Sequence, residues 1–253
     1  MLIIPENIYG HSKRLNWIVS HLRKTDRIVE IGCGTGVMIT APLARMDYEI
    51  IGLDIDEKSI RFGQELLKKQ GLNPNILMVA DIGTVDVNPD VIIVSEVIEH
   101  LSDQEISGMM EMVHQRLKPH GRLLITAPNG YGWFELESWL WFRARLGRWI
   151  ERLRFDTLIR RMKQMVFRNI LEEFTPSTLS NTSHLQRFTY QSIRRLIEHH
   201  GFEITDDTGS VLFAGPFSNL FLSGIESSMK WNCIIGETFP RLAAGFYIAC
   251  KLL

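Results

Sequence analysis

Three glycines, each two residues from the next, occur in the run Glu30-Ile31-Gly32-Cys33-Gly34-Thr35-Gly36. The residues just before them, 27–31, have the apolar, β-branched character of a short buried strand. Glycines at this spacing let the chain turn tightly and bring bare backbone close to a ligand before a helix begins. The run therefore predicts the first strand and turn of an α/β sheet, with a nucleoside-type ligand bound at the turn.

A related turn binds dinucleotides, but its glycine spacing is different. In the dinucleotide version the third glycine comes three residues after the second, whereas Gly36 follows Gly34 by two. A second strand, predicted at 48–53, is followed by Asp54, close to the offset of about 20 residues at which an acid binds ribose hydroxyls. An NAD-dependent oxidoreductase remains an alternative, and the glycine spacing disfavours it.

Strand-like and helix-like segments alternate along the chain. Strands are predicted at 27–31, 48–53, 76–79, 90–94 and 121–127, and helices at 12–23, 37–46, 57–70 and 103–117. A helix at 190–200, ended by Gly201, a strand at 202–205 and an apolar last strand at 245–253 follow. This alternation predicts an α/β fold, a doubly wound sheet with helices on both faces.

The order of these motifs resembles that of the class I S-adenosylmethionine-dependent methyltransferases. The likeness continues with Asp81 after the third strand, Ser95-Glu96 after the fourth, and Leu117-Lys118-Pro119-His120-Gly121, which is similar to the family's L-K-P-G-G. It covers about residues 10 to 130 and returns near 184 to 205. The resemblance implies a Rossmann-like, mostly parallel seven-stranded sheet with an antiparallel last strand, and S-adenosylmethionine as the methyl donor.

The resemblance also implies which residues bind the donor. The ribose would meet Asp54, the adenine would lie near Asp81 and Ile82, and the methionine end would meet Glu30, Gly32 and Ser95. Cys33 is interpreted as a small buried spacer in the turn rather than a nucleophile. The full predicted cofactor set is Glu30, Gly32, Cys33, Gly34, Gly36, Asp54, Ile55, Asp81, Ile82, Ser95 and Glu96.

Composition limits the function classes. The chain has 253 residues, a net charge of −1 and a pI of about 6.7, so it has no global basic field for nucleic acid. Its three cysteines are too few and too irregularly spaced for a disulfide framework or a zinc knuckle. We expect a cytoplasmic protein with peripheral membrane contact at most, because no stretch approaches the roughly 20 apolar residues of a membrane span.

We expect one methyltransferase domain over residues 1–253, with a helical insertion at 131–183 after the fifth strand. Four of the six tryptophans lie in this insertion, interleaved with arginines. The favoured interpretation is a lid packed on the sheet; the other is a set of amphipathic helices that lie in a membrane interface or cover an apolar substrate. The apolar stretch 213–225 could line the mouth that this insertion covers.

A candidate metal site follows the fourth strand, where Ser95-Glu96-Val97-Ile98-Glu99-His100 contains the pattern E-x-x-E-H. In a helical turn beginning at Glu96, these three polar side chains would share one face and could bind Mg²⁺ or another divalent ion. The hexad resembles the metal-binding segment of the ubiquinone-pathway O-methyltransferases and of enzymes that methylate the terminal ribose 2′-hydroxyl of small RNAs. That likeness implies His184 as the fourth ligand, giving the set Glu96, Glu99, His100 and His184.

A metal-free alternative stays open, because many relatives have this pattern with no known metal, and glutamates there favour the positive end of the following helix. In either case His100 is the first candidate for general base and His184 the second. We expect O-methylation of a small or amphipathic acceptor, whether phenolic, lipid-linked or an anionic glycoside. RNA is disfavoured by the net charge. A non-catalytic S-adenosylmethionine-binding protein or membrane adaptor is the alternative from another class, and the oligomeric state stays open.

Overall fold

The structure is a computed structural model that describes residues 6–166, 176–180 and 184–252. Parts of two predicted segments, 167–175 and 181–183 of the insertion and residue 253 of the last strand, lie outside this range. The described strands are β1 (Arg27–Ile31), β2 (Glu49–Asp54), β3 (Leu77–Val79), β4 (Val91–Ser95), β5 (Arg122–Pro128), β6 (Phe202–Gly209) and β7 (Gly245–Leu252).

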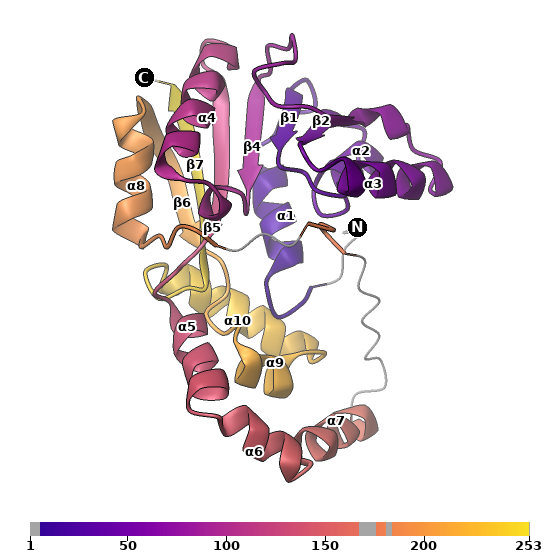
Figure 1. Cartoon of the computed structure of the whole chain (residues 1–253), viewed down its shortest axis with the longest axis vertical. Coiled ribbons are helices and arrows are strands. Elements are labelled where there is room, and N and C mark those ends of the chain that lie inside the picture. Colours follow the sequence, from indigo (N-terminus) through magenta and orange to yellow (C-terminus); the bar gives the residue numbers. More distant parts are fainter. Residues whose placement is uncertain (1–5, 167–175, 181–183, 253) are drawn as a thin grey trace.

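The described helices surround this sheet and extend below it (Figure 1). They are α1 (His11–Ser20), α2 (Thr40–Arg45), α3 (Glu57–Lys69), α4 (Asp103–Arg116), α5 (Trp133–Ser138), α6 (Leu146–Arg152), α7 (Phe155–Val166), α8 (Tyr190–His199), α9 (Pro216–Leu222) and α10 (Glu226–Thr238). Shorter turns are the 3₁₀ segments η1 (Pro74–Ile76) and η2 (Ile98–His100) and the π-helical η3 (Trp139–Arg143).

The seven strands form one sheet in the order β3-β2-β1-β4-β5-β7-β6. Only β7 runs against its neighbours, pairing antiparallel with both β5 and β6. The predicted mostly parallel sheet with an antiparallel last strand is therefore confirmed. The winding reverses between β1 and β4, and such a switch point leaves a crevice at the carboxyl ends of the strands, where ligands of this fold class bind.

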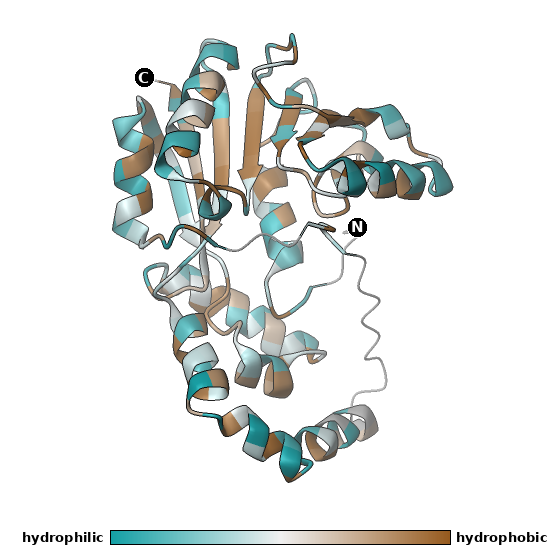
Figure 2. Cartoon of the chain, in the orientation of Figure 1, coloured by the Kyte–Doolittle hydropathy of each residue, from teal (hydrophilic) through white to brown (hydrophobic). Residues whose placement is uncertain are grey.

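Alternating residues of the strands build two apolar layers, as Figure 2 shows for the brown centre of the sheet. Ile28 of β1 and Ile93 of β4 pack with α1 and α2 on one face. Val29 and Ile92, one position along, pack with α4 and α8 on the other. Successive side chains of a strand point to opposite faces, so these buried strands are apolar at almost every position.

Local side-chain chemistry explains where two of the helices, α3 and α2, begin. Asp56 caps α3, with its carboxylate accepting from the backbone N–H of Lys58 at 3.2 Å and of Ser59 at 3.3 Å. The helix predicted from Val37 begins only at Thr40. Pro42 explains the delay, because its ring would clash with the carbonyl of Met38 if the helix included that residue.

Below the carboxyl ends of the strands lies a second layer, which we call the helical lobe and define as residues 133–166 and 216–238. The sequence analysis did not predict α9 and α10. In the described part of the insertion, α6 packs on η3 and α7, and α7 packs on α9. Figure 1 shows α6 and α7 in an arc away from the sheet, so the interpretation of this segment as a lid packed on the sheet is wrong for these helices.

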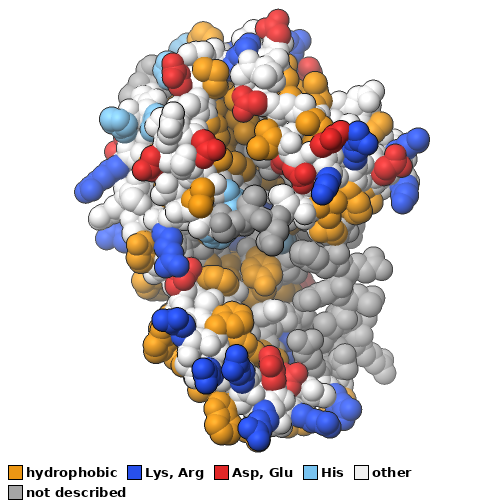
Figure 3. Space-filling model, in the orientation of Figure 1, with side chains coloured by type: hydrophobic (Ala, Val, Ile, Leu, Met, Phe, Trp, Pro, Cys, Tyr) orange, Lys and Arg blue, Asp and Glu red, His pale blue; other side chains and the backbone are white. Residues whose placement is uncertain are grey.

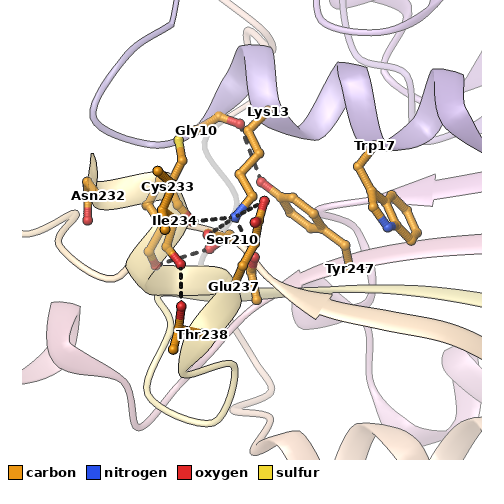
Figure 4. A network of polar contacts seen from close by, with 12 residues as sticks. Gly10, Lys13, Trp17, Ser210, Asn232, Cys233, Ile234, Glu237, Thr238 and Tyr247 are labelled. Carbon is orange, nitrogen blue, oxygen red and sulfur yellow. Dashed lines mark hydrogen bonds and ion pairs between the residues drawn. The ribbon is translucent and has the colours of Figure 1, made fainter. Parts of the chain in front are cut away.

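The N-terminal helix α1 joins the sheet to the helical lobe through Lys13 (Figure 4). The Lys13 ammonium donates to the carbonyls of Gly209 at 2.8 Å, Ser210 at 2.5 Å and Cys233 at 2.8 Å, and it lies 3.3 Å from the carboxylate of Glu237. Burial lowers the pKa of Lys13, and these partners satisfy all three donors. The bonds fix α1, whose next residue, Arg14, reaches the candidate site.

Candidate active site

The glycine run forms a tight turn directly after β1. Gly32, Gly34 and Gly36 all have positive φ, at 69°, 56° and 72°. A Cβ on Gly32 would lie 2.4 Å from the side chain of Val97, so only glycine fits this close approach between the turn and the segment after β4. The predicted tight turn is therefore present at the switch point of the sheet, packed closely against the segment after β4.

Asp54, at the end of β2, braces the glycine turn. One carboxylate oxygen accepts from the backbone N–H of Gly34 at 2.7 Å, and the other accepts from that of Asp56 at 2.8 Å. Each oxygen keeps a second lone pair, and the side chain is half-buried. The adjoining Ile55 side chain is 82 % exposed, which offers an apolar surface beside these oxygens.

The other residues predicted to contact the methyl donor differ in their solvent exposure. Asp81 is exposed, and its carboxylate accepts from the N–H of Gly83 at 2.8 Å. The Ile82 side chain is buried in the core. Glu30 is also buried and accepts a hydrogen bond from the hydroxyl of Thr40, while burial raises its pKa to about 7. Burial raises the pKa of Cys33 as well, which fits an inert spacer.

The far end of the insertion lies against the glycine turn. The backbone N–H of Thr35 donates to the carbonyl of Ser177 at 2.8 Å, and its hydroxyl donates to that of Pro176 at 2.8 Å. Leu179 donates its N–H to the hydroxyl of Ser59 on α3 at 2.8 Å. Residues 176–180 therefore border the predicted cofactor turn, although they lie about 140 residues away in sequence.

After β4 the chain does not form the helical turn predicted from Glu96. Glu96 has φ of 56°, in the left-handed region, and the 3₁₀ turn η2 follows. One oxygen of its carboxylate accepts from the Thr126 hydroxyl at 3.0 Å and lies 3.4 Å from the Arg14 guanidinium. Ser95 shares a hydrogen bond of 2.8 Å with the same Thr126 hydroxyl. The expected convergence of Glu96 with Glu99 and His100 on one helical face is therefore wrong.

Three other predicted residues do converge. Potential ligand atoms of Glu99, His100 and His184 all lie within 4.8 Å of one another. The rings of His100 and His184 meet edge to face, with their centroids 4.9 Å apart. Glu99 is 2 % exposed, and its second carboxylate oxygen has no hydrogen-bond partner among the described residues. Burial and the neighbouring charge of Glu96 raise the pKa of Glu99 to about 9, and burial lowers that of His184.

Backbone bonds bring the distant His184 to this cluster. The carbonyl of Glu99 accepts from the N–H groups of Leu185 at 2.8 Å and Gln186 at 3.0 Å. Two residues further on, Phe188 bridges to Asn129 just after β5. A buried, unsatisfied carboxylate oxygen beside two imidazoles has the ligand chemistry of a divalent metal site, so the residues present fit such an ion.

The sequence analysis missed two residues that contact the site. Arg14 of α1 is 9 % exposed and contacts Glu96, and its charge partly offsets the burial that raises the pKa of Glu30 and of Glu99. The only signal for it was a Lys-Arg pair in a helix that otherwise reads as amphipathic. Thr126 was signalled by a hydroxyl in the apolar strand β5.

A large apolar cavity lies in the helical lobe, with a volume of about 500 Å³. Its aromatic lining comes from α5, α9, α10 and the segment before α9, namely Trp133, Phe213, Phe217, Phe221 and Trp231. Glu137 also lines it, but its carboxylate is occupied by the N–H and the hydroxyl of Ser218. The surface of the cavity is therefore almost wholly apolar. Part of it comes from the apolar stretch 213–225.

The family description "Methyltransferase domain" matches residues 11–206. The chain belongs to this methyltransferase family. Membership replaces the NAD-dependent oxidoreductase interpretation, and it agrees with S-adenosylmethionine as the donor for which the glycine turn and its acids are suited.

Curated relatives of this methyltransferase match over part of their length. A probable cobalt-precorrin-6B C(15)-methyltransferase of Methanobrevibacter smithii is 28 % identical over 113 residues, 43 % of this chain and 57 % of the relative. A ubiquinone biosynthesis O-methyltransferase of Rhizobium johnstonii is 29 % identical over 105 residues, 41 % of each protein. The matched stretch therefore spans about half the length of these relatives.

Solved structures share the whole fold at low identity. A S-adenosylmethionine-dependent methyltransferase of Methanosarcina mazei has a TM-score of 0.55 and 20 % identity, covering 94 % of this chain and 97 % of that one. Magnesium protoporphyrin IX methyltransferase of Synechocystis, bound to S-adenosylhomocysteine, has a TM-score of 0.55 and 13 % identity over 97 % and 83 % of the two chains. The fold of this methyltransferase is thus the class I fold. Among its described residues, no helix combines the length and apolar character needed to cross a bilayer.

Proposed function

We propose that this methyltransferase transfers a methyl group from S-adenosylmethionine to a hydroxyl oxygen of an amphipathic acceptor. The observation that carries the proposal is the cluster of Glu99, His100 and His184 next to the switch point of the sheet. The ubiquinone-pathway relative is an O-methyltransferase by name, which supports oxygen as the accepting atom.

The donor-binding role falls to the glycine turn and the acids around it. Asp54, with a free lone pair on each oxygen, accepts from the ribose hydroxyls, and the exposed Ile55 and Asp81 lie at the adenine. Glu30 and Ser95 face the methionine end. S-adenosylmethionine supplies an activated methyl group on a positive sulfur, so these residues need only orient it and exclude water.

The acceptor hydroxyl must lose its proton when the methyl group arrives, and the histidine pair can take that proton. His100 lies at the mouth between β4 and α4, and His184, with its lowered pKa, is neutral at neutral pH. With a divalent ion such as Mg²⁺ or Mn²⁺ bound, Glu99, His100 and His184 would be its ligands, and the ion in place of the imidazoles would promote loss of the proton by acidifying a nearby hydroxyl. Glu96 stays with Arg14 and Thr126 and holds the strand end in place.

The aromatic cavity of the helical lobe supports an amphipathic acceptor. A cavity of about 500 Å³ is within the range of roughly 300 to 1,000 Å³ that holds a small organic ligand. Its surface is almost wholly apolar, so it favours an aryl or alkyl group over sugar, phosphate or RNA. The polar end of the acceptor then lies at the histidines and its apolar end in the cavity.

The test is methyl transfer to paired phenolic acceptors, one with an alkyl chain and one without. We expect a methyl ether from both, a lower KM for the alkylated one, loss of turnover with a chelator, and recovery with Mg²⁺ or Mn²⁺. Titration calorimetry with Mn²⁺ should show binding that His184→Ala removes, while the exposed His199→Ala retains it.

The outcomes separate the parts of the proposal. Methylation only at nitrogen or carbon would overturn the O-methylation. Turnover that survives the chelator, together with no Mn²⁺ binding, would leave the histidines as bases and remove the metal. Donor binding without transfer to any acceptor would favour the non-catalytic alternative.

A further inference from the structure

The segment of the helical lobe that points away from the sheet has an unusual surface. We call residues 139–166 the basic arm; it consists of η3, α6 and α7. It contains eight arginines and lysines and two acids, a net charge of +6 in a chain whose total is −1. Figure 3 shows these blue side chains along the lower edge of the molecule, interleaved with orange apolar ones.

The arginines of the arm whose side chains the structure describes form no ion pair with an acid of the arm. The ion pairs of the described arginines involve residues elsewhere in the chain, at positions 14, 27, 61, 116, 122 and 194. Arg148, Arg152 and Arg154 are exposed. Their charge is therefore available to an external anionic surface.

Large apolar side chains stand in solvent beside these charges. On α7, Phe155, Leu158, Met162 and Met165 recur at intervals of three or four residues, so they share one face, and Met165 is 76 % exposed. Lys163, on another side of α7, donates to the carbonyl of Leu220 on α9 at 2.9 Å. The stripe therefore faces away from the protein.

The neighbouring helix α6 repeats this pattern. Leu146, Trp149 and Leu153 also follow a spacing of three and four, and Trp149 is 60 % exposed. Arg148 and Arg152 each precede an apolar member of this row. Two consecutive helices thus present exposed apolar rows bordered by arginines. An exposed apolar surface with a charged rim is typical of an interaction site.

We propose that the basic arm binds the surface of an anionic lipid bilayer. Helices of this composition lie in the plane of the interface, with tryptophan and aliphatic side chains among the acyl chains and arginines at the headgroups. Acidic headgroups match the net charge of +6. A second copy of the chain is the weaker occupant, because a two-fold contact would oppose two such charges. This role does not depend on the methyl-transfer reaction.

The basic arm contacts the helices that line the apolar cavity. Lys163 ties α7 to the end of α9, and Phe221 and Leu222 near that end line the apolar cavity. A bilayer held by the arm would therefore lie close to a cavity suited to an apolar group.

The experiment is flotation of the full chain with vesicles of phosphatidylcholine alone, and of phosphatidylcholine with phosphatidylglycerol. We expect binding to the anionic vesicles, weakened by added salt, and a blue shift of tryptophan emission on binding. Arg148→Glu with Arg152→Glu should weaken binding about tenfold or more. Lys68→Glu with Lys69→Glu, exposed on α3, is the matched control and should bind like the parent chain.

Three results would overturn the proposal: no flotation with anionic vesicles, equal flotation with both vesicle types, or equal loss in the two double variants. Self-association that Arg148→Glu with Arg152→Glu abolishes, without vesicle binding, would assign the arm to a dimer instead. Trp149→Ala, which keeps the charges, should also weaken flotation and remove most of the emission shift. Circular dichroism of each variant checks that the fold is retained.

Discussion

The sheet half and the helical lobe of this methyltransferase differ in how they bury apolar residues and pair their charges. Around the sheet, apolar residues are buried and the site acids are held by backbone N–H groups, as at Asp54. In the basic arm, apolar residues are exposed, and no arginine whose side chain the structure describes forms an ion pair. The arm has a net charge of +6 and the rest of the chain −7. The comparison teaches that the sheet half satisfies its apolar and charged groups within the fold, whereas the basic arm leaves apolar surface and positive charge exposed to external partners.

The strongest test of the donor site's independence is Glu99→Gln combined with His100→Ala. We expect turnover to fall by about 10³-fold, because general base and candidate ligands are both removed. Donor affinity should change by less than about twofold, since the glycine turn is untouched. Single-turnover assays and calorimetry measure the two effects. A matching loss of donor affinity would show that the two sites are one.

Glu30→Gln tests how burial shapes the sheet half. Burial raises the pKa of Glu30 from 4.5 to about 7, so the folded state binds this proton more tightly than the unfolded chain does. The associated stability is complete below pH 4.5 and is lost as the pH rises through 7. At pH 8 the variant should gain on the order of 3 kcal/mol in its free energy of unfolding relative to the parent. Urea unfolding of the donor-free chains at pH 4.5 and 8 measures it, and parallel pH profiles would contradict it.

Asp54→Ala tests the link between the turn and the donor. The variant loses the acceptor of the Gly34 N–H and the proposed acceptor of the ribose hydroxyls. We expect the donor Kd to rise about 10- to 100-fold. Asp86→Ala, at an exposed acid, is the control and should leave the Kd unchanged. Equal affinities of both variants by calorimetry would remove Asp54 from the donor site.

Trp231→Ala tests the acceptor side alone and should give the smallest effect. Trp231 stacks on Phe213 in the wall of the cavity, with ring centroids 6.0 Å apart. We expect the KM of an alkylated acceptor to rise about tenfold with kcat retained, since an apolar contact is lost equally in ground and transition states. Leu242→Ala, exposed and outside the lining, is the control. A fall in kcat with unchanged KM would place Trp231 near the reacting atoms instead.

Short-range signals predicted much of the sheet half. The five parallel strands predicted up to residue 127 are present, with ends shifted by one residue at most, because apolar runs and punctuating residues act over a few positions. The α2 start was misplaced because Pro42 acts through a carbonyl four residues earlier. In the lobe, α9 was missed because the Gly and Pro at its start hid the helical pattern, and α10, which follows it, was not predicted either.

The residues of the candidate site also divide into those that the sequence predicted and those that it did not. Glu99 and His100 were predicted from adjacent positions, and His184 from the family resemblance. The geometry of Glu96 was mispredicted because its left-handed backbone breaks the expected turn. Arg14 was missed, since nothing in a Lys-Arg pair says that it will be buried against acids 80 residues away.

By itself, the sequence determined the glycine turn and the strand order along the chain, because spacing and apolar periodicity specify local backbone, and its resemblance to the class I methyltransferases implied the donor. Only the tertiary structure decided that one carboxylate oxygen of Glu99 has no hydrogen-bond partner among the described residues, that His184 joins His100, and that the basic arm stands clear of the sheet. These are outcomes of packing between segments far apart in the chain, where burial and charge depend on neighbours that no local pattern encodes.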